Sequence, residues 1–434
     1  FSKSSEEYKY LIKRRKDLGG FLPNRTTHSS KLKFIDDHFK DFNKSSTRDM
    51  STTMVFVKIL TSMMRDKKIG KNIVPIVPDE ARTFGMDGLF RQFGIYSREG
   101  QKYMPEDSDQ VMWYRESEDG VMLEEGINEA GAMSAWIALA TSYSTNNLPM
   151  IPFYIFYSMF GFQRVHDLAW AAGDARAKGF LLGATSGRTT LNGEGLQHQD
   201  GHSHIFAQTI PNCKSYDPCF GYELSSIIEE GVIEMYQKNK DVYYYLTLMN
   251  ENYKHIARPK NATNYAIING GYLLKKASKP KLRILGSGVT LRFAIEASDK
   301  LQEMNINSEV WSITSFNELT RGGISADRAE NHIEKGEASY AENCFSQPLP
   351  TIAVSEYQRS YPEQIRKWVN GKYTCLGTDG FGRSDTRERL RSFFEINSDH
   401  IVFNALVSLD KLKEAKSFAK TNNLVFEKED PWKK

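Results

Sequence analysis

The apolar positions of the chain alternate between a helical spacing and short uninterrupted runs. In STTMVFVKILTSMMRD, residues 51–66, apolar side chains recur every three or four positions after Ser51, which predicts a capped helix. IVPIVPDEARTF, residues 73–84, predicts a short buried strand that leads into acidic residues. Residues 124–143 are rich in Ala and Gly and predict another helix. Because strands and helices alternate, we predict the α/β fold class.

The same alternation continues in two series. MIPFYIFYSMF predicts a strand that passes into an amphipathic stretch at 163–175, and GFLLGATS and DVYYYLTLMNENY predict further strands. After a turn-rich region that begins near Arg258, a second strand-turn-helix series contains KLRILGSG, VTLRFAIEASDKL, SEVWSITS, PTIAVSEY and HIVFNALV. We therefore predict one domain at 50–258 and a second α/β domain at 259–434. In such sheets, ligands bind where strands end in Gly-rich turns.

Residues 1–49 are polar and charge-rich, and we predict that they form a connector. A Gly-Gly-Phe-Leu-Pro break lies at 19–23, and only short helical patterns such as 8–16 occur. The sequence opens with Phe1 and has no apolar core next to a small-residue cleavage site, so it does not read as a signal peptide. We expect a processed or truncated chain.

Length, charge and cysteine content narrow the class of protein. The 434 residues correspond to roughly two or three domains. A net charge of +3, without basic clustering after the connector, argues against a nucleic-acid partner. No apolar run is long enough for a membrane span. The four cysteines lack metal-site spacing and are too sparse for a disulfide scaffold, which favours a reducing cytoplasm.

The densest cluster of polar functional groups is GRTTLNGEGLQHQDGHSH, residues 187–204. Imidazole and carboxylate ligands suit zinc or iron, so His198, Asp200, His202 and His204 could bind a metal ion along one face of an extended segment. A catalytic or substrate-contacting histidine is a second interpretation, and structural hydrogen bonding is a third. The residues alone leave all three open.

A second cluster is LEEGINEAGAM, residues 123–133. Glu129 stands among small residues, where a carboxylate is poorly hydrated and its pKa depends on its partners. We interpret Glu124 and Glu125 as solvated carboxylates of the first helical turn.

Two more segments have alternative interpretations. The aromatic run between 153 and 162 either packs in the core or forms a stacking wall for a flat heterocycle. LGTDGFGRSDTRERLRSFF, which begins at Leu376, either forms a salt-bridged turn that caps a helix or serves as an interface or anion loop.

Four motifs carry a family resemblance: GINEAGAM, STNNLPMIPFYIFYSMFGFQR, SGRTTLNGEGLQHQDGHSH and IPNCKSYDP. Together they resemble the homodimeric-type pyruvate dehydrogenase, the thiamine-diphosphate-dependent decarboxylating component of the pyruvate dehydrogenase complex. The resemblance runs from about residue 5 to the C-terminus and also includes PDEARTFGMDGLFRQFGIYS. It implies a connector, a pyrimidine-binding domain at 50–258 and a transketolase-type C-terminal domain.

The resemblance also implies that a further domain, which binds the diphosphate and Mg²⁺, lies outside this chain. A member of the family carries a Gly-Asp-Gly motif followed by an Asn for that purpose, and this sequence contains neither in the expected arrangement. We therefore expect the chain alone to be catalytically incomplete.

By resemblance, Glu129 matches the glutamate that bonds N1′ of the aminopyrimidine ring and favours its imino tautomer. Phe160 matches the ring that stacks on the aminopyrimidine, and Tyr157 matches a tyrosine that contacts the cofactor. Arg164 matches an arginine on a polar route between the two active sites of the dimer. His198 matches a histidine that faces the substrate. The cofactor-binding set is thus Glu129, Tyr157, Phe160 and Arg164, and the catalytic set is Glu129 and His198.

The resemblance assigns no metal to the histidine cluster, so Asp200, His202 and His204 become structural, with Glu194 a weaker candidate for polar support. It implies oxidative decarboxylation of pyruvate by a homodimer, with acetyl transfer to the lipoyl domain of the dihydrolipoyl acetyltransferase. No nucleic-acid or membrane partner is expected. The alternatives are a metal-dependent hydrolase built on the 198–204 cluster and a non-catalytic assembly module.

Overall fold

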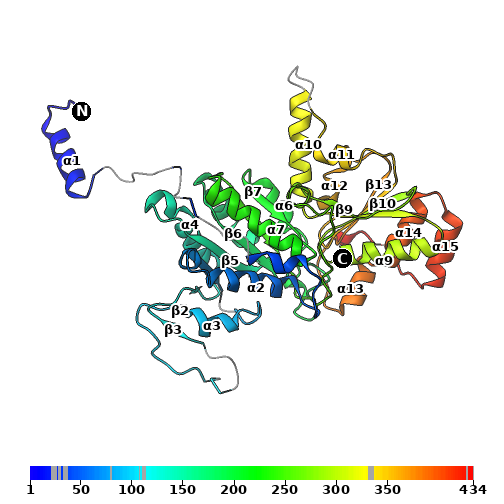
Figure 1. Cartoon of the computed structure of the whole chain (residues 1–434), viewed down its shortest axis with the longest axis horizontal. Helices are drawn as coiled ribbons and strands as arrows, with labels where there is room; N and C mark the ends of the chain where they lie inside the picture. Colours follow the sequence, from blue (N-terminus) through cyan, green and yellow to red (C-terminus); the bar gives the residue numbers. More distant parts are fainter. Residues whose placement is uncertain are drawn as a thin grey trace.

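The structure is a computed structural model that describes residues 1–20, 27, 31–32, 38–78, 81–106, 108–109, 114–330, 337–426 and 429–433. Two α/β domains lie side by side along the long axis of the molecule (Figure 1). Helix α1 (Glu6–Asp17) stands apart from both domains in each view and has no buried residue. The predicted α/β class is confirmed.

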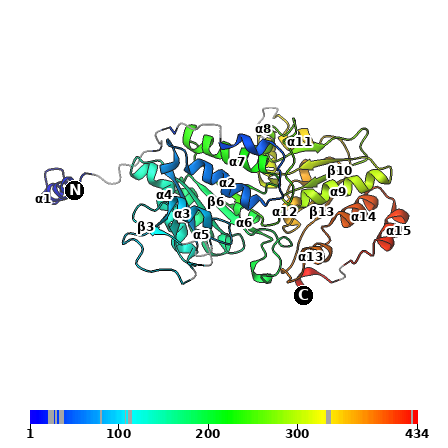
Figure 2. The same ribbon diagram turned by 60° about the horizontal axis from the view of Figure 1, so that its bottom comes forward.

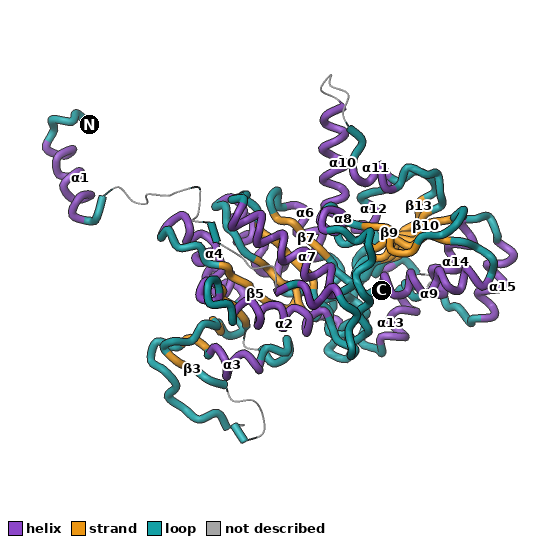
Figure 3. Tube along the Cα trace, in the orientation of Figure 1, coloured by secondary structure: helices purple, strands orange, loops and turns teal. Residues whose placement is uncertain are grey.

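The first domain, residues 51–253, is built on a six-stranded sheet. Its strand order is β4 (Leu123–Glu124), β1 (Ile73–Val77), β5 (Ile151–Tyr157), β6 (Phe180–Ala184), β8 (Tyr243–Thr247) and β7 (Cys213–Tyr216). All neighbouring strands are parallel. Parallel strands are covered on both faces, which explains why the central strands are continuous apolar or aromatic runs. Figure 3 shows these strands enclosed by helices.

The first domain contains six α-helices within its described residues. They are α2 (Thr52–Met64), α3 (Asp87–Phe93), α4 (Glu129–Thr145), α5 (Gly161–Asp174), α6 (Ser203–Thr209) and α7 (Gly221–Val232). Of these, α2, α4 and α5 lie in segments predicted to be helical or amphipathic. Ser51 caps α2 as predicted, because its side chain accepts a hydrogen bond from the Met54 amide. Helices α4 and α5 pack on each other, with α4 against β5 and β1. A small parallel pair, β2 (Ile95–Tyr96) and β3 (Glu116–Ser117), lies beside α3.

The second domain, residues 264–424, contains a five-stranded sheet. Its order is β13 (Tyr373–Leu376), β12 (Thr351–Val354), β10 (Leu282–Gly286), β11 (Ser308–Ser312) and β9 (Tyr272–Lys275). Only β9 is antiparallel to its neighbour. The helices are α8 (Asn264–Ile268), α9 (Thr290–Glu303), α10 (Phe316–Glu330), α11 (Tyr340–Cys344), α12 (Ser360–Glu363), α13 (Arg387–Phe393), α14 (Ser398–Ser408) and α15 (Leu412–Thr421). Figure 2 shows α9, α14 and α15 at the outer end of this domain.

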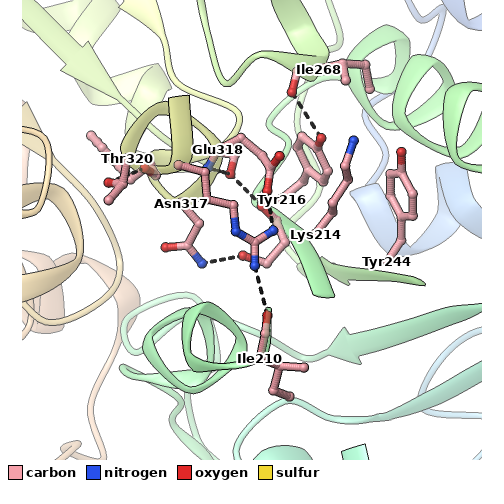
Figure 4. Close-up of polar contacts among 12 residues, drawn as sticks. Ile210, Lys214, Tyr216, Tyr244, Ile268, Asn317, Glu318 and Thr320 are labelled. Carbon is pink, nitrogen blue, oxygen red and sulfur yellow. Dashed lines mark hydrogen bonds and ion pairs between the residues drawn. The ribbon is translucent and has the colours of Figure 1, made fainter. Parts of the chain in front are cut away.

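The two domains share a polar interface between α10 and β7 (Figure 4). The side-chain amide of Asn317 donates to the hydroxyl oxygen of Ser215 at 2.6 Å and to the carbonyl of His204 at 2.8 Å. Arg321 donates to the carbonyl of Ile210 at 2.9 Å. Because these groups are largely buried and bonded, the interface fixes the position of one domain against the other.

One predicted element was wrong at its start. The helix expected from residue 124 begins at Glu129, and Glu124 belongs to the short strand β4, which pairs with β1. Glu124 and Glu125 are therefore not first-turn carboxylates of this helix. The cause is local: Gly126 has a φ of +68°, which interrupts a helix, and the Asn128 side chain caps the helix that follows.

Two sequence predictions involve residues outside the described set. The Phe-Leu-Pro part of the predicted break at 21–23 lies there, as do the acidic residues that follow β1 at 79–80. Among the described residues, none of the helices combines the length and the apolar character that a bilayer crossing requires.

Candidate functional site

Glu129 is the first residue of α4, and its carboxylate forms an ion pair with the Arg164 guanidinium of α5. The helix starts here because the side-chain oxygen of Asn128 accepts a hydrogen bond from the Gly131 amide at 3.0 Å. A carboxylate in a first helical turn also lies toward the positive end of the helix dipole. The Glu129 side chain is only 12% exposed. It is therefore a largely buried carboxylate with a cationic partner.

Phe160 and Tyr157 extend this site on the side of β5. Tyr157 is the last residue of the strand, and Phe160 precedes the first residue of α5. The Arg164 guanidinium carbon lies 4.2 Å from the centroid of the Phe160 ring, a cation–π arrangement. The two aromatic rings have a centroid distance of 6.0 Å. Both residues are half-buried, so part of each ring surface is accessible to another molecule.

The remaining rings of the aromatic run have a different environment. Phe153, Phe156 and Phe162 are each 1% exposed. Phe153 stacks on Phe180 with a centroid distance of 4.6 Å, and Phe162 meets the Tyr245 ring edge-on. These three side chains therefore pack in the core, which is one of the two interpretations that the sequence left open for the aromatic run.

His198 lies against the same two aromatic rings. Its ring centroid is 5.6 Å from that of Tyr157 and 5.1 Å from that of Phe160. Nδ1 is 2.9 Å from the carbonyl oxygen of Glu194. Because a carbonyl can only accept, Nδ1 carries the proton, and Nε2 of the neutral ring is an acceptor. Glu194 thus supports the imidazole through its backbone, while its side chain is exposed.

Asp200 and His202 have local hydrogen-bond partners. Asp200 is fully buried, and its Oδ1 accepts from the amides of His202 and Ser203 at 2.9 and 3.0 Å. The ring of His202 lies 2.7 Å from the side-chain amide nitrogen of Gln163. Burial lowers the pKa of His202, against the opposing charge of Asp200. These contacts favour a structural role for the carboxylate at the start of α6.

His204 lies deeper than the other histidines of the cluster. Nε2 is 3.0 Å from the hydroxyl oxygen of Thr247, and the ring stacks on Tyr361 with a centroid distance of 4.9 Å. Complete burial lowers the pKa of His204 to about 3, so the imidazole is neutral across the physiological range. Throughout the described part of the chain, no three His, Cys, Asp or Glu side chains are grouped so that they could hold a metal ion.

Three buried polar residues near the site were not predicted from the sequence: Arg188, Gln199 and Glu356. Arg188 donates to backbone carbonyls of the second domain, and Glu356 of the second domain accepts from the Thr189 amide at 2.7 Å. The sequence signal for Arg188 is a charged residue inside the run of small residues TSGRTT. Gln199 and Glu356 have no comparable local signal.

The arrangement therefore combines three chemical capacities on one surface. Glu129 can hold or exchange a proton next to Arg164. Phe160 and Tyr157 offer aromatic surface for a flat ring. His198 can donate to or accept from a polar molecule beside those rings. A small aromatic heterocycle with a ring nitrogen is a suitable ligand for this set.

Comparisons with known proteins match the whole of this region. The family model for the pyruvate dehydrogenase E1 component middle domain matches residues 34–256, and the model for the transketolase-like C-terminal domain matches residues 270–397. The chain is 55% identical over 416 residues to the pyruvate dehydrogenase E1 component of Pseudomonas aeruginosa, an alignment that covers 93% of this chain and 47% of the relative. It is 49% identical over 424 residues to the Escherichia coli protein of that name, covering 95% of this chain and 48% of the relative.

Solved structures with low sequence identity share the fold. A transketolase from Leishmania mexicana superposes with a TM-score of 0.67 at 13% identity, over 94% of this chain and 51% of its own. A split-gene transketolase, described as an inactive β4 tetramer, has a TM-score of 0.56 at 13% identity, over 83% of this chain and 98% of its own.

The matched family model covers more than half of the residues, and its range contains Glu129, Phe160 and His198. The chain spans about half the length of the curated relatives that it matches. The resemblance noted in the sequence is thereby confirmed: this chain belongs to the family of the pyruvate dehydrogenase E1 component.

Proposed function

We propose that this chain is the part of a thiamine-diphosphate-dependent pyruvate dehydrogenase that binds the aminopyrimidine ring of the cofactor. In the complete protein, pyruvate loses CO₂, and the acetyl group and two electrons pass to the disulfide of a lipoyl group. The observation that carries the proposal is the contiguous cluster of Glu129, Arg164, Phe160, Tyr157 and His198.

The residues fit the cofactor by their chemistry. When bound, thiamine diphosphate supplies an electron sink for the decarboxylation of a 2-oxo acid. Glu129 would share a proton with N1′ of the aminopyrimidine, a task that requires an ionisable carboxyl. Phe160 would stack on the ring, with Tyr157 beside it. Arg164 keeps Glu129 in place through their ion pair.

His198 would act on the substrate rather than on the cofactor ring. An imidazole that lies against Tyr157 and Phe160 can donate a hydrogen bond to the carboxylate or carbonyl oxygen of pyruvate. Because Nδ1 donates to the Glu194 carbonyl, Nε2 is the nitrogen left to face the substrate, and it donates to an oxygen of pyruvate in the doubly protonated form of the ring. His198 is therefore proposed as the second catalytic residue of the chain.

We propose further that the active unit is a homodimer of subunits longer than this chain. Following the family resemblance, the diphosphate and Mg²⁺ would be bound by a domain in the part of the relatives that this chain does not span. The split-gene transketolase described as inactive, nearly all of which this chain matches, supports the expectation that this chain alone does not turn over substrate. The four cysteines are free thiols, which supports a reducing cytoplasm as the location.

The test is reconstruction. The chain is joined to the part of the Pseudomonas aeruginosa relative that it does not span, and CO₂ release from pyruvate is measured with thiamine diphosphate, Mg²⁺ and an artificial electron acceptor. We expect activity that depends on thiamine diphosphate in the joined protein and none in the chain alone. Light scattering should give a dimer for the active form. An active monomer would contradict the dimer proposal.

The same preparation tests the alternatives. Elemental analysis of the purified chain should find no stoichiometric zinc or iron, and retention of either metal by the histidine cluster would favour the metal-dependent hydrolase. A joined protein that folds and dimerises but releases no CO₂ from pyruvate would favour the non-catalytic assembly module.

A further inference from the structure

The segment at 186–200, which carries His198, begins at the end of strand β6 and is bound there by the second domain. The amide of Thr189 donates to Oε2 of Glu356 at 2.7 Å, and its hydroxyl donates to the other carboxylate oxygen. Glu356 is fully buried. Gly187 has a φ of +90°, and a Cβ at this position would lie 3.0 Å from Glu356. The backbone at the start of the segment, residues 187–189, therefore packs closely against a carboxylate of the other domain.

Arg188 connects the start of the segment to the loop at 377–386, which joins β13 to α13. Its guanidinium donates to the carbonyl oxygens of Thr378 and Gly380. Arg188 is 3% exposed, so the side chain acts from inside the protein. A Cβ on Gly201 would come within 2.4 Å of the guanidinium carbon. The Arg188 side chain thus also packs on the backbone of Gly201, immediately after the end of the segment.

Gln199 closes the segment at its other end. Its side-chain amide nitrogen donates to the carbonyl of Leu191 at 2.8 Å and to the carbonyl of Arg383 at 2.8 Å. Its side-chain oxygen accepts from the Arg383 amide at 2.8 Å. Gln199 is fully buried. The Gln199 side chain therefore links Leu191 to the end of the segment, and it binds the segment to the 377–386 loop.

Between Leu191 and Gln199, residues 192–197 are largely exposed. His198 directly precedes Gln199. Gly193 and Gly195 have φ values of +82° and +89°, which permit the tight path of the exposed part. The imidazole is held near the Tyr157 ring by this backbone. A change at Gln199 is therefore transmitted directly to His198, the residue before it.

We propose that Gln199 is a positioning residue for His198, and that the 377–386 loop of the second domain is the support through which it acts. This inference rests on the proposed function of His198. The loop would fix the imidazole before substrate binds, which limits the rearrangement needed during the reaction. In this way the second domain contributes to the site without supplying a group that touches substrate.

The first test measures His198 without any enzymatic assay. The rate of hydrogen–deuterium exchange at the imidazole C2 position is measured by mass spectrometry on this chain, for Gln199→Leu and for Gly382→Ala. Leucine removes all three side-chain hydrogen bonds. An alanine Cβ at 382 would lie 2.5 Å from Oε1 of Gln199. Gly382→Ala therefore displaces the 377–386 loop from Gln199, while the glutamine itself is unchanged.

We expect the His198 exchange rate to rise about threefold or more in both variants, as local structure loosens, while His255 and His400 stay unchanged. Gln364→Leu is the matched control, because this half-buried glutamine binds Asn317 within the second domain. It should leave His198 unchanged. If Gln199→Leu does not fold, Gly382→Ala decides alone. An unchanged His198 rate in the folded variants would overturn the proposal.

The second test uses the joined protein. Gln199→Leu should lower kcat for pyruvate decarboxylation by roughly 10- to 100-fold, and it should have little further effect in a His198→Ala background, because it acts through that histidine. Equal losses in both backgrounds would overturn the positioning role. If the unmodified joined protein does not decarboxylate pyruvate, the proposed function fails, whereas the exchange measurement still decides whether Gln199 positions His198.

Discussion

The carboxylate of Glu129 lies at the start of helix α4 and forms an ion pair with Arg164. Glu129→Gln in the joined protein keeps the shape of the side chain but removes the ionisable group. We expect turnover to fall by about 10²- to 10⁴-fold, with folding retained. Steady-state CO₂ release and circular dichroism measure the two effects. The exposed Glu303→Gln change at the end of α9 is the control, and full activity in the Glu129 variant would remove it from the mechanism.

His198 is half-buried and has one hydrogen bond to a backbone carbonyl, so few stabilising contacts depend on it. We expect His198→Ala in the joined protein to lower turnover or slow acetyl transfer, with little change in Tm or in thiamine diphosphate affinity. Single-turnover kinetics and calorimetry separate these quantities. A large fall in Tm with normal turnover per folded molecule would instead make His198 a structural residue.

Residues of the site differ in how far the sequence could identify them. Glu129, Phe160 and His198 were assigned through motifs that are continuous in sequence. The contacts of Arg188 and Gln199 could not be assigned in that way, because Arg188 meets the backbone of Thr378, 190 positions away. A backbone acceptor has no side-chain signature, so only the folded chain reveals the pair.

At the scale of elements, Gly126 and the Asn128 cap show why a helix was predicted five residues too early, since the apolar pattern of 124–143 carries no information about a positive φ. The strands were easier to predict. The runs that became β1, β5, β6 and β8 are apolar or aromatic almost throughout, because a parallel sheet buries both faces.

Two adjacent glycines of α10 allow a direct test of packing in one element. A Cβ on Gly322 would meet nothing within 4 Å, whereas a Cβ on Gly323 would lie 2.3 Å from the ring of Trp368. We expect Gly322→Ala to raise the free energy of unfolding by about 0.5–1 kcal/mol, and Gly323→Ala to lower it by about 1–3 kcal/mol. Urea unfolding of both variants measures the difference, and effects of the same sign would contradict the described packing of α10.

At the scale of the whole molecule, Asp217 is a buried carboxyl where the two domains meet. Its amide donates to the Thr314 carbonyl, and its own carbonyl accepts from the Gly288 amide. Burial raises the pKa of Asp217 from an ordinary 3.8 to about 7, against the hydrogen bond that the Thr247 hydroxyl donates to its carboxylate. Between these values the folded chain keeps a proton that the unfolded chain releases, so this group contributes stability at low pH that is lost as the pH rises toward about 7.

Asp217→Asn removes that titration, because an amide does not ionise in this range. We expect the stability of the variant relative to the unmodified chain to increase from pH 5 to pH 7 and then to level off. Urea unfolding midpoints at several pH values measure it, with the exposed Asp410→Asn change as the control. A constant difference between variant and unmodified chain across that range would show that Asp217 does not titrate there.

The hydrogen bonds from Thr189 and Gln199 to Glu356 and Arg383 cross the boundary between the two matched family ranges. The two family ranges are separate in the sequence, but the contacts around His198 involve residues from both ranges. A chimaera that exchanges the second domain between two relatives would disrupt these contacts, even if the two parts were joined between the matched ranges, near residue 260. Such a hybrid should keep its active-site geometry only when the residues on both sides of the seam are transplanted as one group.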